Sequence, residues 1–149
     1  MGFFDWACKS RLCGCGVLIA IELDKFYHFL WEGGSGSNNR VEIIALWGLL
    51  LTSSWLNISN LHIFRDSKGC IDWIKGLSCY QPHLLTYWMK RICILINVFQ
   101  RIDFNHIYRE QNLIGDLLSK RGILASLGII LYVVYNRDSR FDFGTIPIS

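Results

Sequence analysis

The chain lacks an apolar run long enough to cross a lipid bilayer. Its two longest apolar segments, 43–51 and 122–135, fall short of the roughly 20 residues that a spanning helix needs. The N-terminus has no basic segment followed by an apolar core, and Trp6 stands where N-myristoylation requires Ser or Thr. We therefore expect an intracellular protein, nuclear or cytoplasmic and not secreted, without a membrane partner.

Two further signatures are missing. The Gly-rich segment 33–37 lacks the Lys-Ser/Thr ending of a phosphate-binding loop. None of the six cysteines forms a Cys-x-x-Cys pair. A soft metal at Cys8, Cys13 and Cys15 stays an alternative, but reduced cysteines that pack as small apolar residues are the simpler expectation.

The composition is that of one folded domain. Apolar residues make up 52% of the 149 residues, and a chain of this length buries roughly 68–70% of its unfolded surface. The formal net charge of +3 permits a nucleic-acid partner without requiring one. No internal repeat is visible.

Hydrophobic periodicity and turn residues predict an α/β fold. The expected order is strands at 3–8, 14–21 and 25–34, a helix at 40–55, a strand at 60–64, helices at 67–75 and 82–100, a strand at 101–108, and a last helix. Short turns favour antiparallel pairing of the first three strands, and intervening helices favour parallel pairing of the last two. This predicts a five-stranded mixed sheet in a domain of residues 1–122, followed by a partly apolar tail, 123–149.

Four carboxylates stand out against this framework: Asp5, Glu42, Asp66 and Asp116. Taken singly, Glu42 is typical of a surface residue near a helix start, and Asp66 of a helix N-cap. If the first and fourth strands are parallel neighbours, however, Asp5 and Asp66 lie near the crevice of an open α/β sheet. Carboxylates that converge there need a counter-charge, and oxygen ligands favour Mg²⁺ or Mn²⁺.

Four segments carry a family resemblance, in order and in register across residues 3–121. They are Phe-Phe-Asp-Trp-Ala at 3–7, Asn-Asn-Arg-Val-Glu-Ile-Ile-Ala-Leu at 38–46, Arg-Asp-Ser-Lys at 65–68, and His-Ile-Tyr-Arg-Glu-Gln-Asn with Gly-Asp-Leu-Leu-Ser at 106–119. The chain resembles a ribonuclease H type 1 domain, especially the plant form of retroelement-derived, reverse-transcriptase-associated proteins.

The resemblance implies a ribonuclease H-like fold and a catalytic quartet of Asp5, Glu42, Asp66 and Asp116. These acids would bind Mg²⁺ or Mn²⁺, and two such ions would assist hydrolysis of the RNA strand of an RNA–DNA hybrid. The 2′-hydroxyl groups would identify the RNA strand. We expect a monomer.

The resemblance also places further side chains near the nucleic acid: Asn38, Asn39, Lys9, Lys68, Arg109 and Asn112. Each has a structural alternative: the asparagines at 38 and 39 suit helix caps, and the lysines suit a solvated surface. The 109–112 segment suits the turn into the last helix. His106 either forms local bonds at a strand end or assists proton transfer and product release.

Three positions depart from the family pattern. Trp6 follows the first aspartate where a small residue is usual, and Gly115 replaces an alanine. Arg65 precedes Asp66, where its charge either lowers the affinity for metal or pairs with the acids. The alternative function is therefore a catalytically degenerate, retroelement-derived nucleic-acid-binding domain. A membrane-attached or partner-bound structural role rests on the apolar segment 122–135 alone.

Overall fold

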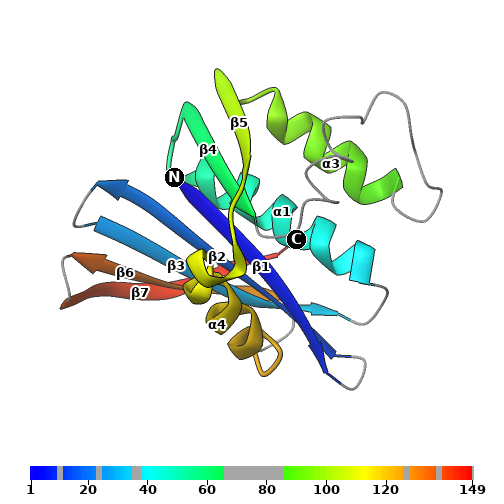
Figure 1. The fold of residues 1–149 in the computed structure, drawn as a ribbon, viewed down its shortest axis with the longest axis vertical. Helices are drawn as coiled ribbons and strands as arrows, with labels where there is room; N and C mark the ends of the chain where they lie inside the picture. Colours follow the sequence, from blue (N-terminus) through cyan, green and yellow to red (C-terminus); the bar gives the residue numbers. More distant parts are fainter. Residues whose placement is uncertain are drawn as a thin grey trace.

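The structure, a computed structural model, describes residues 1–9, 12–22, 25–34, 38–65, 86–125, 128–136 and 139–148. Within these ranges one mixed sheet carries helices on both faces (Figure 1). No helix among the described residues is both long and apolar enough to cross a membrane.

The sheet has seven strands among the described residues, in the spatial order β5-β4-β1-β2-β3-β6-β7. Their bounds are β1 Gly2–Lys9, β2 Leu12–Glu22, β3 Lys25–Gly34, β4 Asn60–Arg65, β5 Arg101–His106, β6 Ile129–Asn136 and β7 Ser139–Pro147. β1, β2 and β3 pair antiparallel in sequence, whereas β4 lies parallel to both β1 and β5. The expected pairing of the first five strands is confirmed.

The expected total of five strands is wrong, because β6 and β7 extend the sheet beyond β3. β6 pairs antiparallel with β3, and β7 pairs antiparallel with β6. Ile130 of β6 is fully buried in the main core. The hydrophobic pattern of an apolar run such as 129–135 is the same for a buried strand as for other buried segments. The pattern therefore did not predict that this run forms a strand of the sheet. The division of the chain at residue 122 stays a prediction.

Helices α1 Asn38–Trp55, α3 Thr86–Ile96 and α4 Leu113–Gly122 lie among the described residues. The helix predicted at 40–55 is confirmed as α1. The helix predicted at 82–100 is confirmed over 86–96, but it ends earlier than expected, before a turn that leads into β5. The helix predicted at 67–75 lies outside the described residues.

α1 and α4 cover opposite faces of the sheet. Side chains alternate along β2, so neighbouring residues of this strand face different helices. Cys15 faces α1, and its Sγ lies 3.9 Å from the carbonyl oxygen of Val41. Gly16 faces α4, where an added Cβ would lie 2.5 Å from the backbone nitrogen of Ser119. The main apolar core lies on the α1 side. Its largest fully buried side chains include Trp31, Trp47, Phe4, Phe29, Leu46 and Ile63.

Two cysteines form a disulfide, which corrects the expectation that all six are reduced. Cys8 and Cys13 lie directly opposite each other in the β1–β2 register and are bonded. Among the described residues, Cys15 and Cys93 are free thiols, and burial raises the pKa of the Cys15 thiol. The cluster of three cysteines considered for a soft metal is thus divided between a disulfide and a buried thiol.

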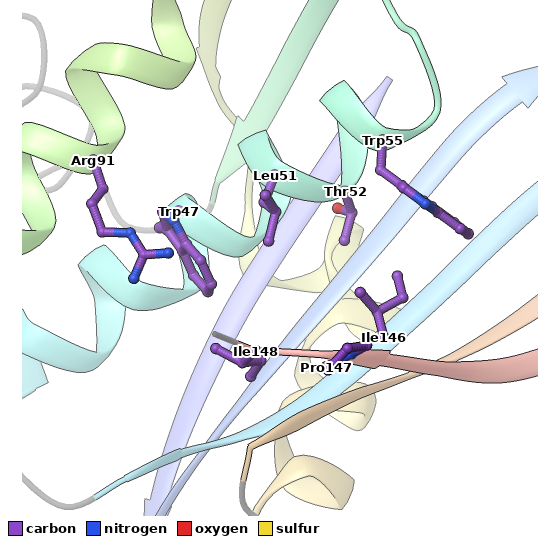
Figure 2. A pocket seen from close by; sticks show the side chains of 8 residues that line it. All are labelled: Trp47, Leu51, Thr52, Trp55, Arg91, Ile146, Pro147 and Ile148. Carbon is purple, nitrogen blue, oxygen red and sulfur yellow. The ribbon is translucent and has the colours of Figure 1, made fainter.

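The end of the chain crosses α1, where a pocket of about 170 Å³ lies between the two. Figure 2 shows Ile146 and Ile148 opposite Trp47 and neighbouring side chains of α1. Arg91 of α3 reaches the same place, with its guanidinium carbon 4.6 Å from the centre of the Trp47 ring. The last strand therefore contributes to the cover over α1.

We expect Ile130→Ala to lower the free energy of unfolding by about 2–5 kcal/mol, because it leaves a cavity in the core. Leu124, which is 89% exposed, is the matched control, and Leu124→Ala should change stability by less than about 0.5 kcal/mol. Urea denaturation measures both variants. Equal effects would contradict the inclusion of β6 in the core.

His28 on β3 should titrate below the ordinary histidine value of about 6.5. Burial, assisted by the charge of Arg121, lowers the pKa of His28. The unfolded chain then binds a proton at a pH where the folded protein does not, so stability falls as the pH drops below about 6.5. Two-dimensional NMR should give the lowered pKa, and His28→Gln should flatten this pH dependence. A titration at or above the ordinary value would contradict the prediction.

Candidate functional site

The candidate site lies at the carboxyl ends of β4 and β5, beside the middle of β1. β1 and β4 pair through Phe3 and Phe64, and β4 and β5 pair through Arg65 and His106. Asp5 follows shortly after the β1–β4 pairing. Parallel strands end at the same edge of a sheet, which is where open α/β sheets bind ligands.

A buried guanidinium joins two of the predicted acids. Arg65 Nη1 donates to Asp5 Oδ1 at 2.9 Å, and Arg65 Nη2 donates to Glu42 Oε1 at 3.2 Å. The exposed fractions of these side chains are 3% for Arg65, 10% for Asp5 and 11% for Glu42. The Arg65 side chain also lies over the Phe4 ring, with its guanidinium carbon 5.2 Å from the ring centre. We call these three charged side chains the Arg65 triad.

The local sequence explains why the triad forms. Leu61, Ile63 and Arg65 alternate along β4 with exposed or half-buried residues, so Arg65 follows two core side chains on the same face. α1 packs on that face and brings Glu42 to the guanidinium. Glu42 is only 9% exposed, so the alternative of a solvated residue at the helix start is wrong.

Asp116 lies on α4 and has a different partner. Its side chain is 36% exposed, and its Oδ2 accepts a bond from Lys120 Nζ at 2.9 Å. Sequence reasoning missed Lys120 as this partner. The spacing of four residues between an acid and a following lysine on a helix was the available signal.

Asn112 fixes the start of α4 against β1. The residue is 2% exposed, and its Nδ2 donates to the carbonyl oxygen of Phe4 at 3.1 Å. An added Cβ at Gly115 would lie 2.5 Å from Asn112 Oδ1, so glycine leaves room for this amide. This burial favours the structural role of Asn112 over contact with a substrate.

Close backbone contact places the remainder of α4. Added Cβ atoms at Gly14 and Gly16 would collide with the backbone of Ser119. At Gly122, an added Cβ would lie 2.6 Å from the carbonyl oxygen of Trp31. Glycines on both elements therefore allow α4, and with it Asp116, to approach the sheet closely.

The other predicted residues are distributed around this edge or lie outside the described part. His106 is exposed at the end of β5, with its ring 6.1 Å from the ring of Tyr108. Arg109, in the 3₁₀ turn Arg109–Gln111, and Lys9, at the end of β1, are exposed. Outside the described part lie Asp66, Lys68 and the side chains of Asn38 and Asn39.

Trp6 does not project fully into solvent. Its indole is half-buried and packs against the core. Its backbone N–H donates to Asp5 Oδ1 at 2.8 Å, so the same carboxylate oxygen receives a bond from Trp6 and another from Arg65. Asp5 is thereby held in one orientation.

The donor chemistry at this edge suits a hard divalent cation, but the described residues do not by themselves present a ready site. Asp5 and Glu42 supply carboxylate oxygens of the kind that Mg²⁺ binds. The guanidinium of Arg65 spans them, however. Among the described residues, no three His, Cys, Asp or Glu side chains gather closely enough to hold a metal ion. A cation at the two acids would have to displace Arg65 or lie beside it.

Comparison with known proteins identifies the family. Residues 3–122 match the family described as reverse transcriptase-like. The chain belongs to the reverse transcriptase-like family. The match covers all four segments quoted above and confirms the resemblance. No curated protein matches the chain.

Solved structures confirm the ribonuclease H-like fold. Ribonuclease H1 of the archaeon Halobacterium salinarum is 18% identical, with a TM-score of 0.70 over 82% of this chain and 95% of the archaeal one. The metagenomic LC11 ribonuclease H1, solved with an RNA/DNA hybrid, is 20% identical, with a TM-score of 0.70 over 82% of this chain and 94% of that one.

A viral protease–reverse transcriptase contains a similar fold within a longer chain. The prototype foamy virus protease–reverse transcriptase is 15% identical, with a TM-score of 0.64 over 84% of this chain. The alignment spans only 21% of the viral chain. At these identities the likeness concerns the fold.

We expect Gly16→Ala to lower the free energy of unfolding by about 1–3 kcal/mol, because its Cβ collides with the α4 backbone. Gly33→Ala is the matched control. Its Cβ would meet Cys15 Sγ at 3.0 Å, Val41 Cγ1 at 3.5 Å and the carbonyl oxygen of Cys13 at 3.6 Å, so no backbone atom comes as close as at Gly16 and the cost should be smaller. Thermal unfolding measures both, and a Gly33→Ala cost at least as large would contradict this account of α4 packing.

Proposed function

We propose that this domain binds RNA–DNA hybrids and hydrolyses the RNA strand with the help of Mg²⁺ or Mn²⁺. The observation that carries the proposal is the convergence of Asp5 and Glu42, from β1 and α1, on one buried position at the carboxyl end of β4. Membership of the reverse transcriptase-like family supports it. The ribonuclease H-like fold, shared with an enzyme solved on an RNA/DNA hybrid, supports it too.

In this proposal, Asp5, Glu42, Asp66 and Asp116 hold the cation. A bound divalent ion would supply the charge that activates a water molecule and stabilises the leaving oxygen of the phosphodiester. The chain's own groups orient that position: the Trp6 N–H fixes Asp5, and the close packing of α4 holds Asp116 near the sheet.

The remaining predicted residues would serve the nucleic acid. Exposed Lys9 and Arg109, together with Lys68, would approach phosphates, and Asn38 and Asn39 would approach the backbone. Asn112 would orient α4 from its buried place. His106, exposed beside the acids' edge, is proposed to assist proton transfer or product release.

Cleavage of a hybrid labelled on the RNA strand tests the proposal. We expect fragments of RNA and intact DNA in Mg²⁺ or Mn²⁺, and loss of cleavage in Asp66→Asn and Glu42→Gln. Asp142→Asn is the matched control, since Asp142 is exposed on β7, away from the acids. Circular dichroism should verify that each variant folds.

Three results would count against the proposal. Salt-dependent binding of the hybrid without cleavage would favour the degenerate, retroelement-derived binding domain instead. Cleavage that persists unchanged in Asp66→Asn would exclude the acids as its source. Absence of both binding and cleavage would contradict either function.

A further inference from the structure

The Arg65 triad contains a positive charge that the chain itself supplies. Its two ion pairs join residues 60 and 23 positions apart in the sequence, so one guanidinium links β4 to β1 and to α1. The exposed fraction of each of the three side chains is 11% or less. Water therefore does little to screen the charges, and each acid depends on a protein or ionic partner.

A guanidinium supplies the positive charge between two carboxylates that a divalent cation would otherwise supply. Its planar fork directs N–H groups to two oxygens at once, and its charge is permanent at any ordinary pH. Here the fork is divided between Asp5 Oδ1 and Glu42 Oε1. The two acids can thus lie close together in the absence of metal.

A divalent ion that enters this position meets two obstacles. Either Arg65 leaves, and a buried charge loses its ion pairs with Asp5 and Glu42, or Arg65 stays, and a charge of +2 lies beside a charge of +1. Both outcomes weaken metal binding relative to the same acids without the arginine. A small or neutral residue at position 65 would remove both obstacles.

We propose that Arg65 is an internal cation that occupies the position between Asp5 and Glu42 and competes there with a divalent metal ion. The proposal rests on the proposed function for the place of the metal, but it concerns binding and not cleavage. In the free protein, Arg65 makes the fold independent of metal. Mg²⁺ or Mn²⁺ binds productively only when the guanidinium is withdrawn.

Thermal unfolding in EDTA and in rising MnCl₂, with electron paramagnetic resonance of bound Mn²⁺, tests the competition. The wild type should unfold at the same temperature in EDTA and in Mn²⁺, and should bind Mn²⁺ weakly. Arg65→Gln should unfold on the order of 10 °C lower in EDTA, because two buried acids lose their partner. Rising Mn²⁺ should restore this loss, and Mn²⁺ should bind at least about tenfold more tightly than to the wild type.

Two further variants serve as controls. Arg65→Lys keeps the charge without the fork, so it should keep Mn²⁺ binding weak. Arg101→Gln makes the same change in net charge at an exposed arginine, whose side chain is 70% exposed and paired with Asp103. It should leave Mn²⁺ binding at the wild-type level, which separates the local effect of Arg65 from the effect of net charge.

Equal Mn²⁺ affinity in the wild type and Arg65→Gln would overturn the proposal. If Arg65→Gln does not fold, the wild type alone decides: tight, micromolar Mn²⁺ binding that Glu42→Gln abolishes would also overturn it, whereas weak binding would support it. A wild type that binds metal tightly and cuts hybrids would sink this inference and leave the proposed function standing. Tight binding by Arg65→Gln without cleavage would do the reverse.

Discussion

The ion pairs between Arg65 and the carboxylates of Asp5 and Glu42 are the interaction on which the candidate site depends. These ion pairs join β1, α1 and β4 through charge. Elsewhere in the core, apolar contacts join the same three elements. A buried charge is tolerated only with well-placed partners. The triad therefore requires that the parallel β1–β4 pairing and the packing of α1 are already correct, and it marks the point where these two features meet.

The two faces of the sheet position the site by opposite means. On the α1 face, large side chains such as Trp31 and Trp47 fill the space and hold the helix that carries Glu42. On the α4 face, glycines at 14 and 16 remove side chains so that backbone meets backbone and Asp116 approaches the sheet. Either face tolerates few changes in volume, because interiors are packed at nearly crystalline density.

The shared fold and this chain's own residues both shape the candidate site. The reverse transcriptase-like family and the ribonuclease H-like fold supply the frame, in which β1 and β4 lie parallel to each other. Arg65 lies between the carboxylates of Asp5 and Glu42 in this frame. The additional strands β6 and β7 leave this region untouched, because the order of the sheet places β2 and β3 between them and β1. These two strands enlarge the core at the opposite edge of the sheet.

The sequence by itself determined the elements whose signals are local. Apolar periodicity predicted α1, alternation and short turns predicted the antiparallel strands, and four ordered segments pointed to the family. Tertiary structure alone decided three other features. The Cys8–Cys13 bond depends on the register of two strands, and the addition of β6 to β3 depends on which sheet edge remains open. The partners of Arg65, which the sequence left open, are residues 60 and 23 positions away. Each depends on contacts between distant segments, whose geometry exists only after the chain has folded.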